Sequence, residues 1–336
     1  MKKIYVIGAG INGMSAAVQL AEHFQNKNVQ VTVMADKLTP FTLSDLVAGL
    51  WSPYLMGNTD PDKIIQWSKG THKFFHELWI NGLAGESGVT MSPVIGLSVE
   101  DPRSCPSWKD IPFGFRELTA DEVEKYSNEH GRNYLSGYQF VSFCCQPKKM
   151  LPYLTKRFLK AGGKFEQRKI VNLEDVTEAD LIINCTGLGG KFLGDDQLHP
   201  IRGQVTRVKA PWMNGVIIDN SDDGNYIIPN DDSVVLGGTH QVDDYNLNVS
   251  LPDHDFINAG CQRMVKSLVN AEMVINGVGL RPGRNSVRLE TEYRGSGKTP
   301  IIHNVGHGGS GVTLSWGCGT EVLERAIDVM NTTAKL

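Results

Sequence analysis

The sequence predicts an α/β fold in which a discontinuous βαβ-type domain carries an inserted, mostly antiparallel α+β domain. Two glycine-rich turns, Gly8–Gly13 and His307–Gly311, indicate the first domain, because each follows an apolar strand-type run and opens a helical pattern. The inserted domain is indicated by residues 51–144, which are richer in aromatic residues, prolines and turn pairs than the flanking segments.

The first 36 residues predict a βαβ unit. Lys3–Ile7 and Val29–Met34 have the apolar content of buried strands, and Asn12–Phe24 carries apolar residues at helical spacing. Asp36 stands just beyond the second predicted strand.

From Pro147 onward the pattern again alternates between helix and strand. Pro147 suits the first turn of a helix that Gly162 and Gly163 end. Lys164–Ile170 predicts a strand, and the apolar run Leu181–Cys185 predicts another that is buried.

The remaining segment is strand-rich and then helical. Val205–Gly237 predicts several strands with a turn at Asp222–Gly224, and Asp255–Val269 predicts a helix. We therefore predict a first domain made of three separated pieces and an inserted second domain made of two. The pieces are residues 1–50, 145–200 and 280–336 for the first domain, and residues 51–144 and 201–279 for the second.

The composition argues against several classes of partner. The chain has a formal net charge of −4 and a pI near 6.1, so it has no bulk attraction to nucleic acid or to anionic membranes. No apolar run reaches the length of about 18 residues that suggests a membrane span. The cysteines show no CxxC spacing, which favours buried, reduced thiols, and no spacing of histidine, cysteine and carboxylate residues suggests a metal site.

The first glycine turn has the pattern of a phosphate site. Gly8 allows a tight turn, Gly10 allows close backbone approach to a pyrophosphate, and Gly13 allows the helix to pack on the strand. The helix N-terminus favours the phosphate charge, and Asp36 is placed to accept hydrogen bonds from an adenosine ribose. This unit suits NAD and FAD alike. The segment Leu181–Gly187 and the second glycine turn favour FAD, because a flavin needs support far from its pyrophosphate.

Seven parts of the sequence together match the pattern of one known family. They are Val6–Gly10, Asp36, Ala48–Tyr54, Asn184–Gly187, Arg202–Gln204, Gly279–Pro282 and His303–Gly309. With these residues the chain resembles the family of D-amino-acid oxidases and D-aspartate oxidases over nearly its whole length. The resemblance implies a Rossmann-type FAD-binding domain with an inserted substrate domain. The chain departs from the usual terminal signature of the family at Val305, where an aromatic residue is common, and at Gly319, where alanine is common.

The glycine motif and the resemblance together define a predicted FAD site. Asp36 and Lys37 would face the adenosine end, and the residues from Gly308 onward would enclose the isoalloxazine ring. The predicted cofactor residues are Gly8, Gly10, Ile11, Asn12, Gly13, Asp36, Lys37, Leu43, Ser44, Ala48, Gly49, Leu50, Ile170, Thr186, Gly308, Gly309, Gly311, Val312 and Thr313.

The resemblance also implies residues for the substrate. Arg281, between Leu280 and Pro282, would hold the α-carboxylate through the paired N–H groups of its guanidinium. Tyr226 would donate its hydroxyl to the same carboxylate, and the backbone at Gly309 would face the flavin pyrimidine. The alternatives are a structural ion pair for Arg281 and a half-buried strand tyrosine for Tyr226.

His240 bears on substrate preference. By the resemblance, it stands where D-aspartate oxidases carry an arginine and oxidases of neutral D-amino acids carry an aromatic residue. A protonated histidine would bind a side-chain carboxylate, so the interaction would depend on pH, whereas a neutral one would only fill space. His307 is expected to support the second glycine turn rather than to transfer protons.

We therefore expect an FAD-dependent oxidase that converts D-amino acids and dioxygen into 2-oxo acids, ammonia and hydrogen peroxide. His240 and the short loop before Tyr226 favour D-aspartate or D-glutamate, while the similarity of Ala48–Tyr54 to neutral D-amino-acid oxidases leaves neutral substrates open. A nicotinamide-dependent dehydrogenase is an alternative, but it would leave the second glycine turn without a purpose. A non-catalytic flavin-binding module is another, against which Arg281 and Tyr226 argue.

The residues Ala334-Lys335-Leu336 resemble the peroxisomal address Ser-Lys-Leu. Hydrogen peroxide as a product agrees with that destination. We expect the protein in the peroxisomal matrix, or otherwise in the cytoplasm, with a peroxisomal import receptor as the partner of these residues. Neither a nucleic acid nor a membrane is expected as a partner.

Overall fold

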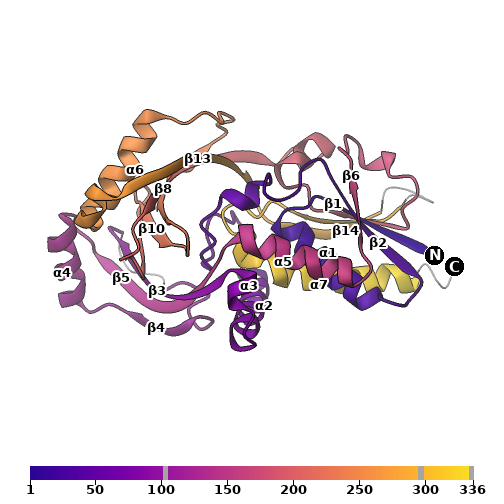
Figure 1. Cartoon of the computed structure of the whole chain (residues 1–336), viewed down its shortest axis with the longest axis horizontal. Coiled ribbons are helices and arrows are strands. Elements are labelled where there is room, and N and C mark those ends of the chain that lie inside the picture. The colour runs from indigo at the N-terminus through magenta and orange to yellow at the C-terminus, as the bar shows by residue number, and fades with distance from the viewer. Residues whose placement is uncertain (101–104, 294–298, 333–336) are drawn as a thin grey trace. The chain divides into compact units, whose positions relative to one another are not determined.

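A computed structural model describes residues 1–100, 105–293 and 299–332 of the chain (Figure 1). It divides into two compact units. The first unit comprises Met1–Val89, Cys145–Pro200 and Arg281–Leu336, and the second comprises Thr90–Cys144 and Ile201–Leu280. Each unit combines a sheet with helices, which confirms the predicted α/β class.

The first unit is built on a sheet of six described strands. They are β1 (Lys2–Ile7), β2 (Val29–Ala35), β6 (Lys164–Gln167), β7 (Leu181–Asn184), β14 (Arg288–Glu292) and β15 (Ile301–Val305). Their order in the sheet is β14-β15-β7-β1-β2-β6. β14 runs antiparallel to β15, and the other neighbours are parallel. The predicted βαβ unit is confirmed, and the strand predicted at Lys164–Ile170 ends at Gln167.

Helices and short 3₁₀ helices accompany this sheet. They are α1 (Ile11–Phe24), α2 (Pro61–Ile80), α3 (Ala84–Ser87), α5 (Pro147–Lys160), α7 (Gly311–Thr332), η1 (Leu43–Leu46), η2 (Leu173–Asp175) and η3 (Gly187–Leu193). α1 contacts α5, α7 and the strands β1 and β2. Successive strand residues point to opposite faces. Tyr5 and Ile7 pack with Leu173 of η2 in one cluster, whereas Ile4 and Val6 are fully buried on the other face.

Residues 51–89 lie in the first unit, whereas the sequence analysis assigned them to the substrate domain. The reason is the packing of α2 on α7. The rings of Phe74 and Trp316 stack with their centroids 3.7 Å apart. A Cβ atom at Gly317 would lie 2.1 Å from the carbonyl oxygen of Trp67, so the two helices approach each other where α7 has no side chain. The periodicity of a sequence predicts local elements and does not reveal such a contact between distant segments.

The second unit is built on a sheet of nine described strands. They are β3 (Val89–Ser98), β4 (Phe113–Glu117), β5 (Ser136–Cys145), β8 (His199–Lys209), β9 (Val216–Asp219), β10 (Tyr226–Pro229), β11 (Val234–Gly237), β12 (Gln241–Val242) and β13 (Glu272–Gly283). Their order is β12-β8-β11-β10-β9-β3-β5-β4, with β13 beside β8. Antiparallel pairs dominate, as predicted, and β3 runs parallel to β9.

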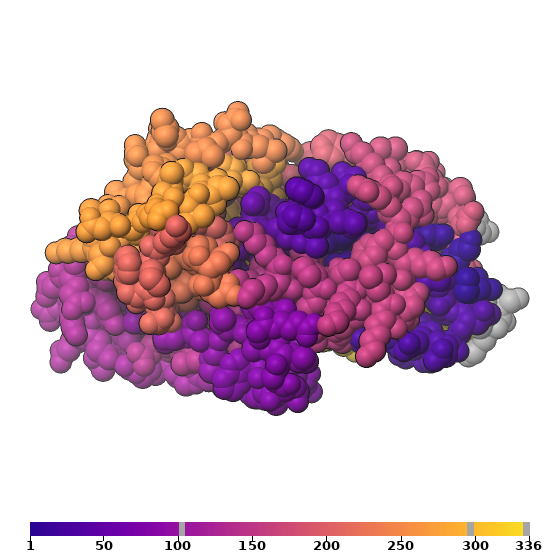
Figure 2. Space-filling view, in the orientation of Figure 1, coloured from indigo at the N-terminus to yellow at the C-terminus, as the bar shows by residue number. Residues whose placement is uncertain are grey.

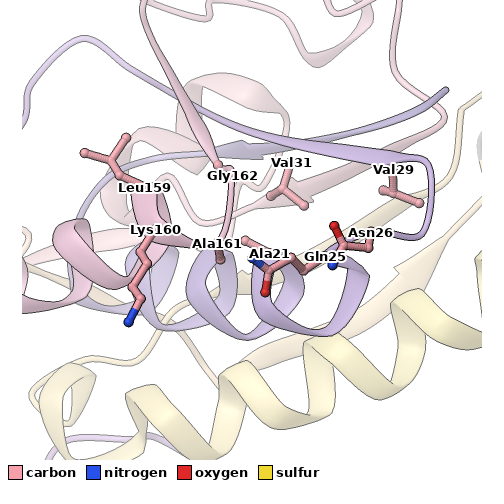
Figure 3. Close-up of a pocket in the computed structure, with 10 residues that line it drawn as sticks. Ala21, Gln25, Asn26, Val29, Val31, Leu159, Lys160, Ala161 and Gly162 are labelled. Carbon is pink, nitrogen blue, oxygen red and sulfur yellow. The ribbon is translucent and has the colours of Figure 1, made fainter.

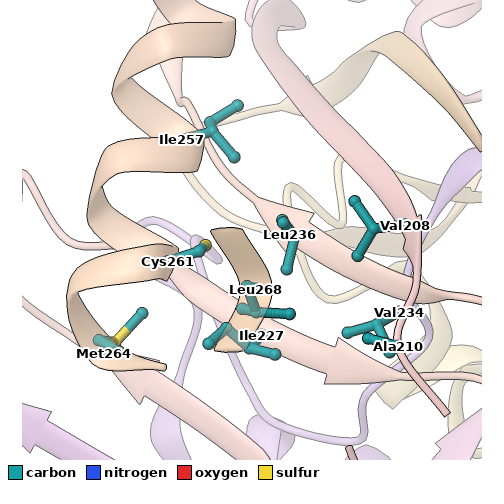
Figure 4. Close-up of a cluster of buried hydrophobic side chains, with 9 residues drawn as sticks. All are labelled: Val208, Ala210, Ile227, Val234, Leu236, Ile257, Cys261, Met264 and Leu268. Carbon is teal, nitrogen blue, oxygen red and sulfur yellow. The ribbon is translucent and has the colours of Figure 1, made fainter. Parts of the chain in front are cut away.

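Helix α6 (Leu251–Met264) packs on this sheet through a buried apolar cluster, to which the 3₁₀ helix η4 (Lys266–Asn270) also contributes (Figure 4). Side chains from β8, β10 and β11 meet the buried face of the helix. The cluster comprises Val208, Ala210, Ile227, Val234, Leu236, Ile257, Cys261, Met264 and Leu268.

Two helices of the second unit begin at capped positions. α6 begins four residues before the predicted start at Asp255, because Ser250 Oγ accepts the Asp253 N–H at 3.3 Å and Pro252 suits the first turn. α4 (Ala120–His130) begins with a capping box between Thr119 and Glu122. Polar caps therefore set both helix starts.

All six cysteines are free thiols, and five are buried. Burial raises the pKa of Cys144, Cys185 and Cys261 to about 12, which keeps these thiols protonated and unreactive. Within the described part of the chain, no helix is long and apolar enough to cross a membrane. The predicted targeting residues 334–336 lie outside the described residues.

Truncation of Ile257 tests the packing of α6 on the sheet. Ile257 is fully buried in the cluster, so Ile257→Ala should lower the free energy of unfolding by about 2–4 kcal/mol through lost burial and a cavity. The neighbouring Phe256 is 41% exposed, and Phe256→Ala should cost less than about half as much. Urea unfolding followed by circular dichroism measures both changes, and equal losses would contradict the packing described.

Candidate functional site

Four parallel strands of the first sheet end at the same edge, and a predicted cofactor residue follows each of them closely. Gly8 follows β1, Asp36 follows β2, Thr186 follows β7 and Gly308 follows β15. Parallel strands point their carboxyl ends in one direction, and α/β proteins bind nucleotides outside that edge. The topology therefore gathers the two distant glycine turns at the edge of one sheet.

The first glycine turn is packed so closely that side chains do not fit. Gly8 has a φ of +111°, and a Cβ atom there would lie 2.4 Å from the carbonyl oxygen of Cys185. A Cβ atom at Gly13 would lie 1.9 Å from the carbonyl oxygen of Gly8. β1, the end of β7 and the first turn of α1 therefore touch through bare backbone.

The N-terminus of α1 has no acidic side chain that would compete with a phosphate for its backbone amide groups. Gly10 at the N-cap has no side chain, and no acidic residue stands in the first turn. The Ile11 N–H donates to Ser44 Oγ at 3.0 Å, which ties η1 to the turn. The partial positive charge of this helix end favours a phosphate.

Asn12 connects the two glycine turns. A Cβ atom at Gly311, the first residue of α7, would lie 3.4 Å from Asn12 Nδ2. Asn12 Oδ1 is buried and has no hydrogen-bond donor among the described residues. Buried polar atoms are normally satisfied, so this oxygen is suited to accept a hydrogen bond from a bound molecule that lies along both turns.

The second glycine turn is fixed by backbone contacts to the segment before α2. Gly308 has a φ of +52°, and a Cβ atom there would lie 1.7 Å from the carbonyl oxygen of Leu55. Ser310 Oγ donates to the Tyr54 carbonyl at 2.8 Å and accepts the Tyr54 N–H at 2.6 Å. Thr313 Oγ1 accepts the Ser52 N–H at 3.2 Å. Hydrogen bonds therefore join the segment Ala48–Tyr54 to the second glycine turn and the first turn of α7.

His307 supports this turn as a neutral side chain. It is 2% exposed, and its Nε2–H donates to Asn304 Oδ1 at 3.0 Å. Burial lowers its pKa to about 4, so the ring carries no charge near neutral pH. The arrangement agrees with a supporting role.

A polar chain runs from Thr186 toward the antiparallel edge strand. Thr186 Oγ1 donates to Asn184 Oδ1 at 2.7 Å, and Asn184 Nδ2 donates to His303 Nδ1 at 3.0 Å. His303 Nε2 lies 2.8 Å from Glu292, which Arg288 also binds at 3.0 Å. Asn184 and His303 lie in segments that resemble the family, but no role for them is predictable from the sequence, because their contact depends on the pairing of β7 with β15.

The predicted adenosine-end residues are the least enclosed. Asp36 and Lys37 are exposed, and the Asp36 carbonyl accepts a hydrogen bond from Gln167 Nε2 at 3.3 Å. The segment near η1 reaches the surface, where it is violet in Figure 2, and Leu43 there is partly buried. Ile170 packs against the apolar cluster that holds Tyr5 and Ile7.

The residues predicted along the middle of the cofactor are more buried. Gly49 has a φ of +80°, and a Cβ atom there would lie 1.8 Å from the carbonyl oxygen of Cys145. Ala48 is buried, and the Leu50 carbonyl accepts from Thr313 Oγ1 at 3.4 Å. Val312, which is predicted beside the isoalloxazine ring, is buried as well.

Arg281 and the second glycine turn are linked through one residue. Arg281 lies near the end of β13, and the carbonyl of the next residue, Pro282, accepts the Gly308 N–H at 2.9 Å. Arg281 as a whole residue is partly buried. The backbone bond fixes the position of Arg281 relative to Gly308.

Tyr226 and His240 belong to the second unit. A Cβ atom at Gly237 would lie 2.1 Å from Tyr226 Cζ, and one at Gly238 would lie 2.9 Å from the Tyr226 hydroxyl, so the phenol ring rests on these two glycines. His240 follows shortly after, and its Nε2 lies 3.1 Å from Asp222 Oδ1. From the sequence, Asp222 is predicted only as a turn residue, and no local signal pairs it with His240.

A pocket of about 280 Å³ in the first unit lies away from this edge (Figure 3). It is formed at the C-terminal ends of α1 and α5 and at the start of β2, whereas the glycine turn is at the N-terminal end of α1. Its lining is Ala21, Gln25, Asn26, Val29, Val31, Leu159, Lys160, Ala161, Gly162 and Gly163. Among the described residues, no cluster of histidine, cysteine and acidic side chains is arranged to hold a metal ion.

Comparison with known proteins assigns the chain to a family. Residues 3–325 match the model of the DAO family, described as FAD dependent oxidoreductase. The chain is 36% identical to a D-amino acid oxidase of Dugesia ryukyuensis, over 97% of this chain and 98% of that protein. It is 35% identical to a D-aspartate oxidase of Homo sapiens, over 95% of this chain and 93% of that protein. The chain belongs to the DAO family of FAD-dependent oxidoreductases.

Solved structures support the same fold. Glycine oxidase from Geobacillus kaustophilus matches with a TM-score of 0.77 and 16% identity, over 97% of this chain and 95% of that chain. Iminodiacetate oxidase from Chelativorans sp. BNC1 matches with a TM-score of 0.74 and 20% identity, also over 97% and 95%. At such identities the likeness concerns the fold alone.

FAD is therefore the cofactor, and the edge of the first sheet fits it. The N-terminus of α1, which has no acidic residue in its first turn, suits the pyrophosphate, and the buried Asn12 Oδ1 suits a hydroxyl group of the cofactor. The glycines of the second turn leave backbone where a side chain would otherwise stand. The predicted cofactor and the Rossmann-type domain are confirmed by the family.

Replacement of Gly13 tests the close packing of the first turn. Because its Cβ atom would overlap the Gly8 carbonyl, Gly13→Ala should weaken FAD binding at least about tenfold. The dissociation constant is measured by quenching of flavin fluorescence on titration with apoprotein. Gly85→Ala is the matched control, since a Cβ atom at Gly85 meets nothing within 4 Å. Unchanged affinity in the Gly13 variant would contradict this site.

The neutral state of His307 predicts a pH dependence of stability. Its pKa is about 4 in the folded protein against an ordinary value of 6.5, so the unfolded chain binds the extra proton between these values. The contribution to stability is therefore complete above pH 6.5 and is lost as the pH falls toward 4. At about pH 5 the loss from this residue should be ~2 kcal/mol.

Unfolding of the wild type and of His307→Gln, compared between about pH 7 and pH 5, measures this contribution. Burial also lowers the pKa of His72 to about 4, so the variant should retain part of the pH dependence. The same pH dependence in both proteins would contradict the assignment to His307.

Proposed function

We propose that the chain oxidises D-amino acids with FAD and dioxygen, with a preference for acidic side chains. The observation that carries the proposal is the near full-length identity of 36% and 35% to a D-amino acid oxidase and a D-aspartate oxidase. The family supports the oxidoreductase class, and the relatives suggest the class of substrate.

The products follow from the chemistry of the cofactor. When bound, FAD would supply the redox chemistry, a two-electron oxidation of the substrate Cα–N bond with dioxygen as the final acceptor, which takes up two electrons and two protons to become hydrogen peroxide. The imino acid then hydrolyses to a 2-oxo acid and ammonia. A nicotinamide-dependent dehydrogenase does not agree with the family.

The side chains of the protein would bind and orient the substrate. Arg281 would form two parallel hydrogen bonds to the α-carboxylate, and Tyr226 would donate its hydroxyl to the same group. The packing of Tyr226 on Gly237 and Gly238 limits the positions open to its ring, which supports an orienting role. Catalysis would then come mainly from positioning.

His240 is the proposed partner of an acidic side chain. Its contact with Asp222 supports this, because the imidazole already receives a carboxylate at hydrogen-bond distance. The neutral alternative rests on the segment Ala48–Tyr54, which resembles oxidases of neutral substrates. Delivery to peroxisomes stays a prediction from Ala334–Leu336.

Substrate comparison with the purified holoenzyme tests the proposal. We expect hydrogen peroxide from D-aspartate with a kcat/KM above that for D-alanine, and we expect His240→Phe to lower the D-aspartate value by about tenfold or more, since one charge-assisted bond is lost. Release of peroxide is followed by a coupled peroxidase assay. A higher kcat/KM for D-alanine contradicts the acidic preference, and absence of flavin reduction by any D-amino acid contradicts the activity.

A further inference from the structure

We infer that Asp222 is a specificity-determining residue that competes with the side-chain carboxylate of an acidic substrate for His240. The inference rests on the proposed oxidation of D-amino acids and concerns residues of the second unit. It gives a task to a residue that lies outside the family motifs matched in the sequence.

The backbone on both sides of His240 is held in place. Thr239 Oγ1 accepts the Gln204 N–H at 2.9 Å. The side chain of Gln241 accepts from Arg202 Nη1 at 3.2 Å and donates to Asp253 at 3.1 Å. Gln241 also pairs with Arg202 in the strand ladder. His240 therefore stands between two anchored neighbours.

The anchoring network is buried. Arg202 is 1% exposed and Gln204 is fully buried, and Arg202 also donates to the backbone carbonyls of Asn246 and Asn248 at 2.8 Å. Breaking such a network leaves buried charges and donors unpaired, so it holds this strand segment rigidly. Residues 202–204 were matched as a family motif without an assigned role, and here they fix the segment that carries His240.

The partner of His240 lies on an exposed turn. Asp222 belongs to the connection between β9 and β10, its side chain is 97% exposed, and its Oδ1 lies 3.1 Å from His240 Nε2. Exposed ion pairs are weak and open readily. A carboxylate of a substrate is chemically equivalent to that of Asp222, so the two compete for the same imidazole.

Asp223 provides a matched comparison. It stands next to Asp222 on the same turn, but its carboxylate binds Arg132, with one bond of 3.2 Å. Arg132 also binds the buried Asp219 at 2.9 Å, and Arg263 lies 3.6 Å from that carboxylate. The Asp223→Asn substitution therefore removes one negative charge from the same turn without removing the partner of His240.

The test compares Asp222→Asn with Asp223→Asn in the FAD-loaded enzyme, with all variants measured at one pH of about 6. The measured quantity is the ratio of kcat/KM for D-aspartate to kcat/KM for D-alanine. We expect Asp222→Asn to raise this ratio about two- to fivefold through a lower KM for D-aspartate, as expected for release of an exposed pair. Asp223→Asn should leave the ratio within error, and the gain should vanish in a His240→Gln background.

An equal change in both variants, no change in either, or a gain that persists without His240 would overturn the competition. Preference for D-alanine in the wild type, together with the expected gain in Asp222→Asn, would contradict the acidic preference and still support the competition. Failure of every D-amino acid to reduce the flavin would instead contradict the proposed function.

Discussion

The close approach of bare backbone at the carboxyl edge of the first sheet is the constraint on which the cofactor site depends. At Gly8, Gly13 and Gly308 a Cβ atom would lie 2.4 Å or less from a backbone carbonyl oxygen. The contacts at Gly8 and Gly13 bring β1, the start of α1 and the end of β7 together, and the contact at Gly308 joins the turn before α7 to Leu55. An edge that exposes backbone in place of side chains suits the phosphate charge and the close approach of the cofactor.

Neutral polar groups complete this edge. Burial keeps His307 uncharged. Asn184 Nδ2 donates a hydrogen bond to His303 Nδ1, so Nδ1 is the ring nitrogen of His303 that carries no proton. Asn12 leaves one buried oxygen for the cofactor. The residues proposed for the substrate come from elsewhere, because Arg281 lies in β13 and His240 lies in the connection between β11 and β12. Cofactor binding and substrate recognition therefore depend on different parts of the sequence.

The local sequence pattern was sufficient to predict much of the fold and both glycine turns. The βαβ unit and the strand at Leu181 are set by apolar periodicity and by turn residues, which a sequence displays directly. Residues 51–89 were assigned to the wrong domain because α2 packs on α7. This long-range contact depends on Gly317 and on the stacked rings of Phe74 and Trp316. The partners of His240 and His303 were missed for the same reason, since Asp222 and Glu292 are ordinary surface-type residues until the strands are paired.

A crystal structure of the chain with FAD tests the central claim most directly. The account predicts one cofactor whose pyrophosphate lies at Gly10 and the N-terminus of α1, with a hydroxyl group donating to Asn12 Oδ1 and the ring system against the backbone of Gly308 and Gly309. A cofactor bound at Gly10 with its ring system away from the second glycine turn would contradict it. So would an Asn12 oxygen that remains without a donor in the complex.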